Sequence, residues 1–157
     1  MVTFVPSKEV AKKFPDIDYT SLSLAYSIVA DGVKKRKRRS KDYVLYVYFS
    51  GKSESFYPFQ RGTKVNIFIS ESIDTKTLFL RHLSHEFRHF MQDKVFKIPL
   101  TKANYDSSTS ETYFNSPIEI DACGFEVMVH FKIMRLYNRI LRFRTSMKDV
   151  LDYNPNL

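Results

Sequence analysis

This sequence has a single cysteine, and it shows neither a long apolar run nor the pattern of an N-terminal leader. Each of these features argues against a class of protein. Cys123 is the only cysteine, so no disulfide can form within the chain and nothing favours an oxidising compartment. No stretch approaches the roughly 18 consecutive apolar residues of a membrane-spanning helix. The first residues, MVTFVPSKEVAKKF, lack the apolar run of a secretory signal peptide. We therefore expect a soluble, intracellular (cytoplasmic) protein with no membrane partner.

The composition is that of a packed protein rather than a disordered one. Apolar residues make up 43% of the 157 positions, and aromatic residues make up 15%. This length suits one domain with a sizeable core, and the chain shows no internal repeat. We predict a single domain over residues 1–157, in which 64–143 carries the main motif and 144–157 forms a polar tail.

The positive charge is concentrated in one segment. The chain has 25 basic and 17 acidic residues, which gives a net charge of +8. Seven of the basic residues lie between positions 34 and 41, and the 18 that remain nearly balance the acidic ones. Such a run is typical of a nuclear-import signal or a phosphate-binding patch. We favour a solvated connection between a helix and a strand, because no aromatic residue is interleaved for base stacking. The candidate contacts to nucleic acid are Lys34, Lys35, Arg36, Lys37, Arg38 and Arg39.

β-Branched and aromatic residues predict a small sheet. Strands are expected at residues 2–5, 43–49 and 64–70, and in the last of these the apolar side chains alternate with other residues. The segment SGKSES reads as a turn, and Pro58 limits the segment FYPFQ to an edge strand or a bulge. We predict that the strands before the longest apolar helix pair mostly in antiparallel fashion.

The spacing of apolar residues predicts two long helices. Asp74 or Thr75 can cap a buried helix that runs to about Phe96. A polar connection over 97–115 follows, and connections of this length often form a lid or a substrate wall. Ser116 then begins a second long helix. Shorter helices are expected over 7–14 and 18–32. The predicted fold class is therefore α+β, with a small, mostly antiparallel sheet packed on a long motif-bearing helix and on a long C-terminal helix.

The sequence His85-Glu86-Phe87-Arg88-His89 lies on the first long helix. Residues four apart share one face of a helix, so His85 and His89 can present two imidazole rings to one point. Glu86 can then take the proton of a metal-bound water. These residue types at this spacing form the HExxH motif of zinc peptidases, and the setting between a strand and an acid-bearing helix favours a real site. The alternative is a chance pentapeptide whose histidines face a polar cleft.

A hydrolytic zinc site needs a third protein ligand, and the last helix offers acidic residues for it. The extended HExxHxxGxxH motif of metzincins is excluded, because Gln92 and Val95 occupy its Gly and third His positions. Geometry alone leaves Glu119 and Asp121 open, since they flank the apolar stripe of the helix on opposite sides, and Glu126 also lies near the border of that stripe. Glu119 also has a structural alternative, as the last residue of a capping box that begins at Ser116.

Residues 64–130 resemble the gluzincins, HExxH metallopeptidases whose third ligand is a glutamate on a later helix. Small members from bacteria and phages, the minigluzincins, often read ExEAxxF there, and this chain reads EIDACGF from position 119. The resemblance implies a zincin-like fold and one Zn²⁺ held by His85, His89 and Glu119, with Glu86 as general base. Many gluzincins support a histidine with an aspartate four residues after the ligand glutamate, where this chain has Cys123.

Other polar residues near the motif have less defined roles. Tyr105 and Tyr113, in the polar connection, can stabilise the oxyanion of amide hydrolysis, as a Tyr or His does in relatives. Ordinary packing is the alternative for both tyrosines, and we favour it. We expect His82 in a supporting or surface position. His130 lies about 16 Å along the last helix from Glu119, too far to share its metal.

These expectations combine into a zinc-dependent peptidase that acts on a peptide or protein substrate. Glu86 would serve as general base, and strand 64–70 would pair with the extended substrate. We expect a monomer. One alternative is a zincin-like binding module without turnover, which the aspartate missing at Cys123 favours. Another alternative is a nucleic-acid-binding protein that uses the basic run at 34–41.

Overall fold

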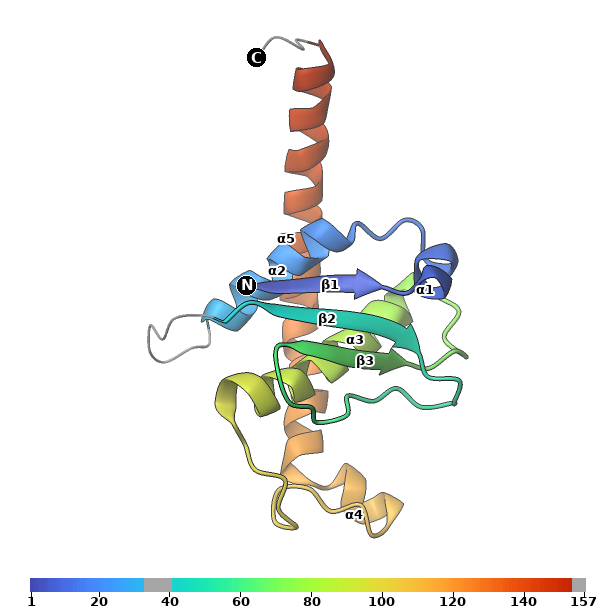
Figure 1. Ribbon diagram of the computed structural model, residues 1–157, viewed down its shortest axis with the longest axis vertical. Coiled ribbons are helices and arrows are strands. Elements are labelled where there is room, and N and C mark those ends of the chain that lie inside the picture. The colour runs from blue at the N-terminus through green and yellow to red at the C-terminus, as the bar shows by residue number, and fades with distance from the viewer. Residues whose placement is uncertain (33–40, 154–157) are drawn as a thin grey trace.

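The computed structural model describes residues 1–32 and 41–153, without the side chains of 148–153, so the basic run at 34–39 lies outside the described residues. The fold is α+β, with a three-stranded sheet in front of α2, α3 and α5 (Figure 1). In chain order the elements are β1 (Val2–Pro6), α1 (Lys8–Lys13), α2 (Tyr19–Gly32), β2 (Tyr43–Phe49), β3 (Lys64–Ile69), α3 (Lys76–Met91), the π-helical turn η1 (Gln92–Phe96), α4 (Ser110–Phe114) and α5 (Pro117–Tyr153).

The sheet is parallel, so the predicted antiparallel pairing is wrong. Its order is β1-β2-β3, with Val2 beside Tyr43 and Val44 beside Lys64. A parallel pair needs a crossover connection of about a dozen residues or more. Residues 50–63 form such a connection, because the chain returns to the starting end of β2 before β3 begins. The turn residues SGKSES therefore reverse the chain without making a hairpin between β2 and β3.

The returning segment, residues 55–60, lies along the outer edge of β3. The backbones of Phe56 and Phe68 exchange two hydrogen bonds of 2.8 and 3.0 Å in an antiparallel bridge. The side-chain amide of Gln60 bonds to both the N–H and the carbonyl of Asn66. Pro58 is compatible with this edge position, as predicted. The edge of β3 that we expected to pair with a substrate is therefore occupied by the chain itself.

Helix α3 lies at the centre of the core. Thr75 caps it by accepting a 3.3 Å hydrogen bond from the backbone N–H of Leu78, which decides between the two predicted caps. Its fully buried apolar side chains are Phe79, Leu83, Phe87, Phe90 and Met91. Burial of each such side chain contributes about 1.5–3 kcal/mol, so α3 is held firmly behind the sheet. The π-helical turn then ends at Lys97, whose φ of 56° is left-handed.

Helix α5 begins at the predicted position but is longer than predicted. It continues to Tyr153, so residues from 144 onward are helical where we expected a polar tail (Figure 1). Arg144 forms an ion pair with Asp18, and the chain has no glycine or proline between Gly124 and Pro155 to stop the helix. None of the helices formed by the described residues is long and apolar enough to cross a membrane.

Candidate metal centre

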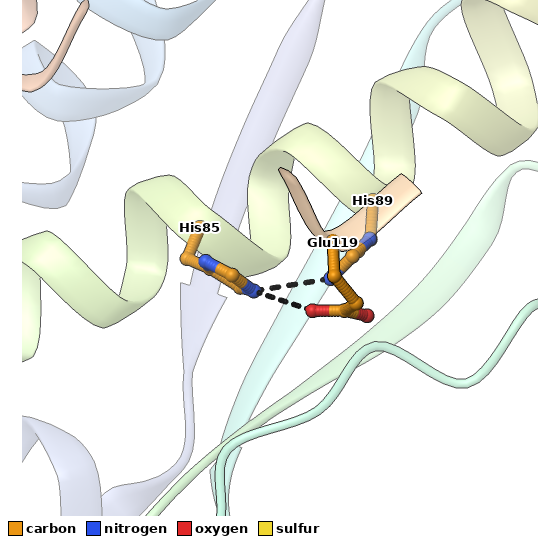
Figure 2. Close-up of side chains that lie close together, drawn as sticks. All are labelled: His85, His89 and Glu119. Atoms are coloured by element: carbon orange, nitrogen blue, oxygen red, sulfur yellow. Dashed lines mark hydrogen bonds and ion pairs between the residues drawn. The ribbon is translucent and has the colours of Figure 1, made fainter. Parts of the chain in front are cut away.

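Two helices bring together three of the predicted ligands. His85 and His89 project from adjacent turns of α3, and Glu119 reaches them from the first turns of α5 (Figure 2). The Glu119 carboxylate lies 3.4 Å from Nε2 of His85 and 3.3 Å from Nε2 of His89. The two Nε2 atoms are 3.1 Å apart, and the three ligand atoms all lie within 4.8 Å of one another. This group could hold a metal ion.

The group is buried and electrostatically coupled. The exposed fractions of the side chains are 16% for His85, 6% for His89 and 3% for Glu119. Burial would raise the pKa of Glu119, but hydrogen bonds from the two histidines lower it to about 2. Burial would lower the pKa of His85, but hydrogen bonds to Glu119 and Glu126 raise it to about 10. The carboxylate therefore stays ionised, and the ligand set combines two imidazoles with one negative oxygen.

Glu86, the acidic residue of the motif, is buried and interacts electrostatically with all three ligands of the group. Its side chain is 3% exposed, and its Oε2 has no hydrogen-bond partner among the described residues. Burial raises the pKa of Glu86 to about 7, although the neighbouring histidines oppose the shift. A buried carboxylate oxygen without a partner, next to three metal-ligand atoms, fits a site that holds a metal and a water.

Glu126 supplies the histidine support that Cys123 cannot. Its carboxylate lies 3.5 Å from Nδ1 of His85 and is itself held by Arg81 at 2.8 Å. Cys123 is exposed. Glu126 follows Glu119 by seven residues, two turns along the same helix face, so the spacing alone could have identified this contact. Glu126, about one helical turn after position 123, therefore provides the carboxylate that the family pattern expects from an aspartate at position 123.

Asp121, the alternate ligand, is turned away from the histidines. It forms a two-pronged ion pair with Arg88, at 2.7 and 2.9 Å. The Glu119 carboxylate points at the histidines, so it is not engaged in the capping box that we considered as an alternative. Sequence reasoning also missed Gln92, which accepts a 2.8 Å hydrogen bond from Nδ1 of His89.

The two tyrosines of the polar connection lie beside the acidic residues of the site. Their rings meet edge to face at 5.7 Å, and α4 carries Tyr113. Burial and the negative charges of Glu119 and Glu86 raise the pKa of both hydroxyls above the usual range. Both therefore stay protonated and can donate a hydrogen bond, while the choice between this role and packing stays a prediction.

The remaining histidines have structural partners. Nδ1 of His82 lies 3.1 Å from the hydroxyl of Ser55, and Nδ1 of His130 lies 3.2 Å from the buried hydroxyl of Ser84. Neither belongs to the metal-ligand group.

No protein-family model, curated protein or solved structure matches the chain. The gluzincin resemblance therefore rests on the sequence motif and on the convergence of His85, His89 and Glu119.

Proposed function

We propose that this chain is a zinc-dependent peptidase of the gluzincin type. The observation that carries the proposal is the meeting of three side chains that lie far apart in the sequence. The two histidines of an HExxH motif meet a buried glutamate from a helix that starts 28 residues after His89, at Pro117. Two imidazoles and one carboxylate are a ligand set that catalytic zinc favours, since three protein ligands leave a position open.

The reaction that fits these residues is hydrolysis of a peptide bond. Bound zinc would supply a Lewis acid that makes water acidic and polarises the scissile carbonyl. Glu86 takes the proton of the attacking water through its unpartnered Oε2 and later delivers it to the leaving amine. Burial raises the pKa of Glu86 to about 7 in the metal-free chain, and the positive charge of a nearby zinc ion would lower it, so the carboxylate would be ionised and able to accept a proton at neutral pH.

Tyr113 and Tyr105 are the candidates for stabilising the oxyanion. Each keeps its proton, because its pKa is raised by burial and by the nearby carboxylates. A hydroxyl that donates to the developing negative charge stabilises the transition state more than the substrate. Tyr113 is the stronger candidate, because α4 holds it next to Glu119.

An extended peptide fits beside residues 55–60 rather than beside β3. This segment contacts both β3, through Phe56, and the metal centre, with the Phe59 ring 6.5 Å from the His89 ring. The segment is therefore the extended stretch of chain that contacts a ligand of the site, and in this proposal the substrate backbone bonds to it. The substrate is accordingly a peptide or protein chain in extended form.

The test compares Glu86→Gln with wild type. The variant should keep its zinc, measured by elemental analysis, because Glu86 is not one of the ligands. Its hydrolysis of a broad peptide library should fall at least about 100-fold, because the general base is lost. Glu71→Gln, an exposed glutamate, serves as the matched control and should match wild type. A zinc-free wild type, or full hydrolysis by Glu86→Gln, would contradict the proposal.

The missing aspartate at Cys123 no longer favours the alternative of a zincin-like binding module without turnover. That alternative rested on the missing aspartate at Cys123, and Glu126 now provides a carboxylate at Nδ1 of His85. The nucleic-acid alternative depends on residues 34–39, which lie outside the described part of the chain. The peptidase is the function that the described residues support best.

A further inference from the structure

Gln92 is the most completely bonded polar side chain near the site. It is fully buried at the first position of the π-helical turn. Its Oε1 lies 2.8 Å from Nδ1 of His89. Its Nε2 donates to the carbonyl of Ile118 at 2.9 Å and to a carboxylate oxygen of Asp121 at 2.8 Å. All three polar contacts are short, and they come from α3 on one side and α5 on the other.

These contacts fix which way the amide faces. The carbonyl of Ile118 and the carboxylate of Asp121 can only accept, so the NH₂ group of Gln92 must point at them. The amide oxygen is then left facing His89. Because that oxygen can only accept, Nδ1 of His89 must carry a hydrogen, and in the neutral ring Nε2 is then left with a free lone pair. Nε2 is the atom that lies 3.3 Å from Glu119, on the side of the metal centre.

Asp121 is itself held in place from outside the site. Arg88 binds both of its carboxylate oxygens, and the guanidinium packs against the rings of Phe96 and Phe125 at 4.7 and 5.2 Å from their centres. Hydrogen bonds from Arg88 and Gln92 hold the pKa of Asp121 below its usual range despite burial, so it remains an acceptor. An amide between a fixed acceptor and a histidine has no second orientation that satisfies every partner.

We propose that Gln92 is a positioning residue that locks the Nδ1–H tautomer of His89, and that the Arg88–Asp121 ion pair in turn fixes Gln92. This inference concerns His89 as a zinc ligand, and it rests on the zinc-dependent peptidase function proposed above. A free neutral imidazole populates both tautomers, and one of them would place a hydrogen where the metal must bind. Gln92, at the position of the metzincin glycine, thus keeps Nε2 of His89 free of a hydrogen in the neutral ring, so that it can bind the metal.

The experiment measures both the proton position and the zinc affinity. Long-range ¹H–¹⁵N spectra of the full chain, metal-free and zinc-loaded, show which nitrogen of His89 carries the proton. Competition with a chelator gives the zinc dissociation constant. Gln92→Met removes the acceptor and keeps a similar volume, and it should weaken zinc binding about 10- to 100-fold. The Nδ1 proton of its zinc-loaded form should exchange rapidly with solvent, whereas the wild-type proton should be protected.

Two further variants separate positioning from folding. Asp121→Asn lies outside the ligand set, and it should weaken zinc binding less than Gln92→Met does, because Ile118 still holds the amide. Asp93→Asn changes the neighbouring residue, which contacts Tyr57 and Lys94 rather than His89, and it should leave zinc affinity unchanged. If Gln92→Met does not fold, the wild-type spectrum and Asp121→Asn still decide the question.

Several results would overturn the lock. One is a neutral His89 ring in the wild-type chain whose proton lies on Nε2 rather than on Nδ1. Another is a folded Gln92→Met that binds zinc like wild type with a protected Nδ1 proton. Unchanged zinc affinity in Asp121→Asn would remove Arg88 and Asp121 from the proposal. A wild type that binds no zinc counts against the proposed peptidase, and the metal-free tautomer then tests the lock by itself.

Discussion

Zinc binding should displace a proton from His85, and this makes the affinity strongly dependent on pH. The ring lies between two carboxylates, with Nε2 near Glu119 and Nδ1 near Glu126. Burial would lower its pKa, but the two hydrogen bonds raise it to about 10. The metal-free chain therefore carries an imidazolium at neutral pH, and a metal must compete with that proton for Nε2.

The size of the effect follows from proton competition at one site. Below the pKa of His85, apparent zinc affinity should rise about tenfold for each pH unit, or roughly thirtyfold between pH 7 and 8.5. A histidine with the usual pKa of about 6.5 would change the affinity only about 1.3-fold over that range. Glu86, with a pKa of about 7, is mostly ionised in the upper part of this window. The slope there belongs mainly to His85 and to any water that ionises on binding.

Glu126→Gln separates these two sources of the slope. The substitution removes one of the negative partners that raise the pKa of His85, whereas ionisation of water is common to both proteins. In chelator competition at several pH values, the zinc affinity of Glu126→Gln should stop rising at a lower pH than that of wild type, because the pKa of His85 is lower in the variant. The same levelling-off pH in the two proteins, or a wild-type affinity that does not change between pH 7 and 8.5, would refute the reasoning.

The stability of the metal-free chain should also depend on pH through the raised pKa of His85. Stability should fall as the pH rises, whereas zinc affinity increases. A group whose folded pKa is raised stabilises the fold fully below its unfolded pKa, about 6.5 for histidine. That contribution is lost as the pH rises through the folded value, about 10 for His85. The melting temperature of the metal-free chain should therefore fall between pH 7 and 10. With zinc bound, His85 has no proton to lose, and this part of the decline should vanish.

Three substitutions test the ligand set, the oxyanion and the core in turn. Glu119→Ala should weaken zinc binding by at least about 100-fold in chelator competition, because it removes a ligand rather than a supporting contact. Tyr113→Phe should lower kcat about 10²- to 10³-fold with little change in KM, if the hydroxyl serves the oxyanion; a kcat equal to that of wild type would assign Tyr113 to packing. Phe87→Ala should lower the free energy of unfolding by about 3–5 kcal/mol in urea titrations, because the ring is fully buried in the core. A loss below about 1 kcal/mol would show that the core collapses around the gap.

The parts of the site that follow local periodicity could be predicted from the sequence. His85 and His89 face the same way because they are four residues apart on one helix, and Thr75 caps that helix through its own side chain. Glu119 could be chosen as the third ligand only through the family pattern. The positions of Glu119 and Asp121 around the axis of α5 do not distinguish them. What decides between them is Arg88, whose guanidinium binds Asp121, and no spacing rule predicts that pair.

The direction of the strands could not be predicted, because it depends on contacts between distant residues. The turn residues after Phe49 mark a reversal of the chain, but they do not specify which strand the returning chain will join. In the structure the returning residues bond to the edge of β3, which follows them in the sequence. Phe56 forms the bridge and Gln60 forms a side-chain hydrogen bond. Strand β3 then pairs with β2 in parallel, and the returning segment contacts both β3, through Phe56, and the metal centre, through Phe59 and His89.

The geometry of the centre depends on how α3 sits against α5, because each helix carries a rigid part of it. His85 and His89 move with α3, whereas Glu119 and its two-turn neighbour Glu126 move with α5. A buried cluster under the site fixes this arrangement: the Ser84 hydroxyl lies 2.7 Å from the Tyr26 hydroxyl and 3.2 Å from Nδ1 of His130 on α5. A slide of α3 by one helical turn, about 5.4 Å, would break both contacts, the one to Tyr26 on α2 and the one to His130 on α5, in a place that water does not reach. Because Ser84 immediately precedes His85, the hydrogen bonds that set the helix register also set the distance from the histidines to Glu119.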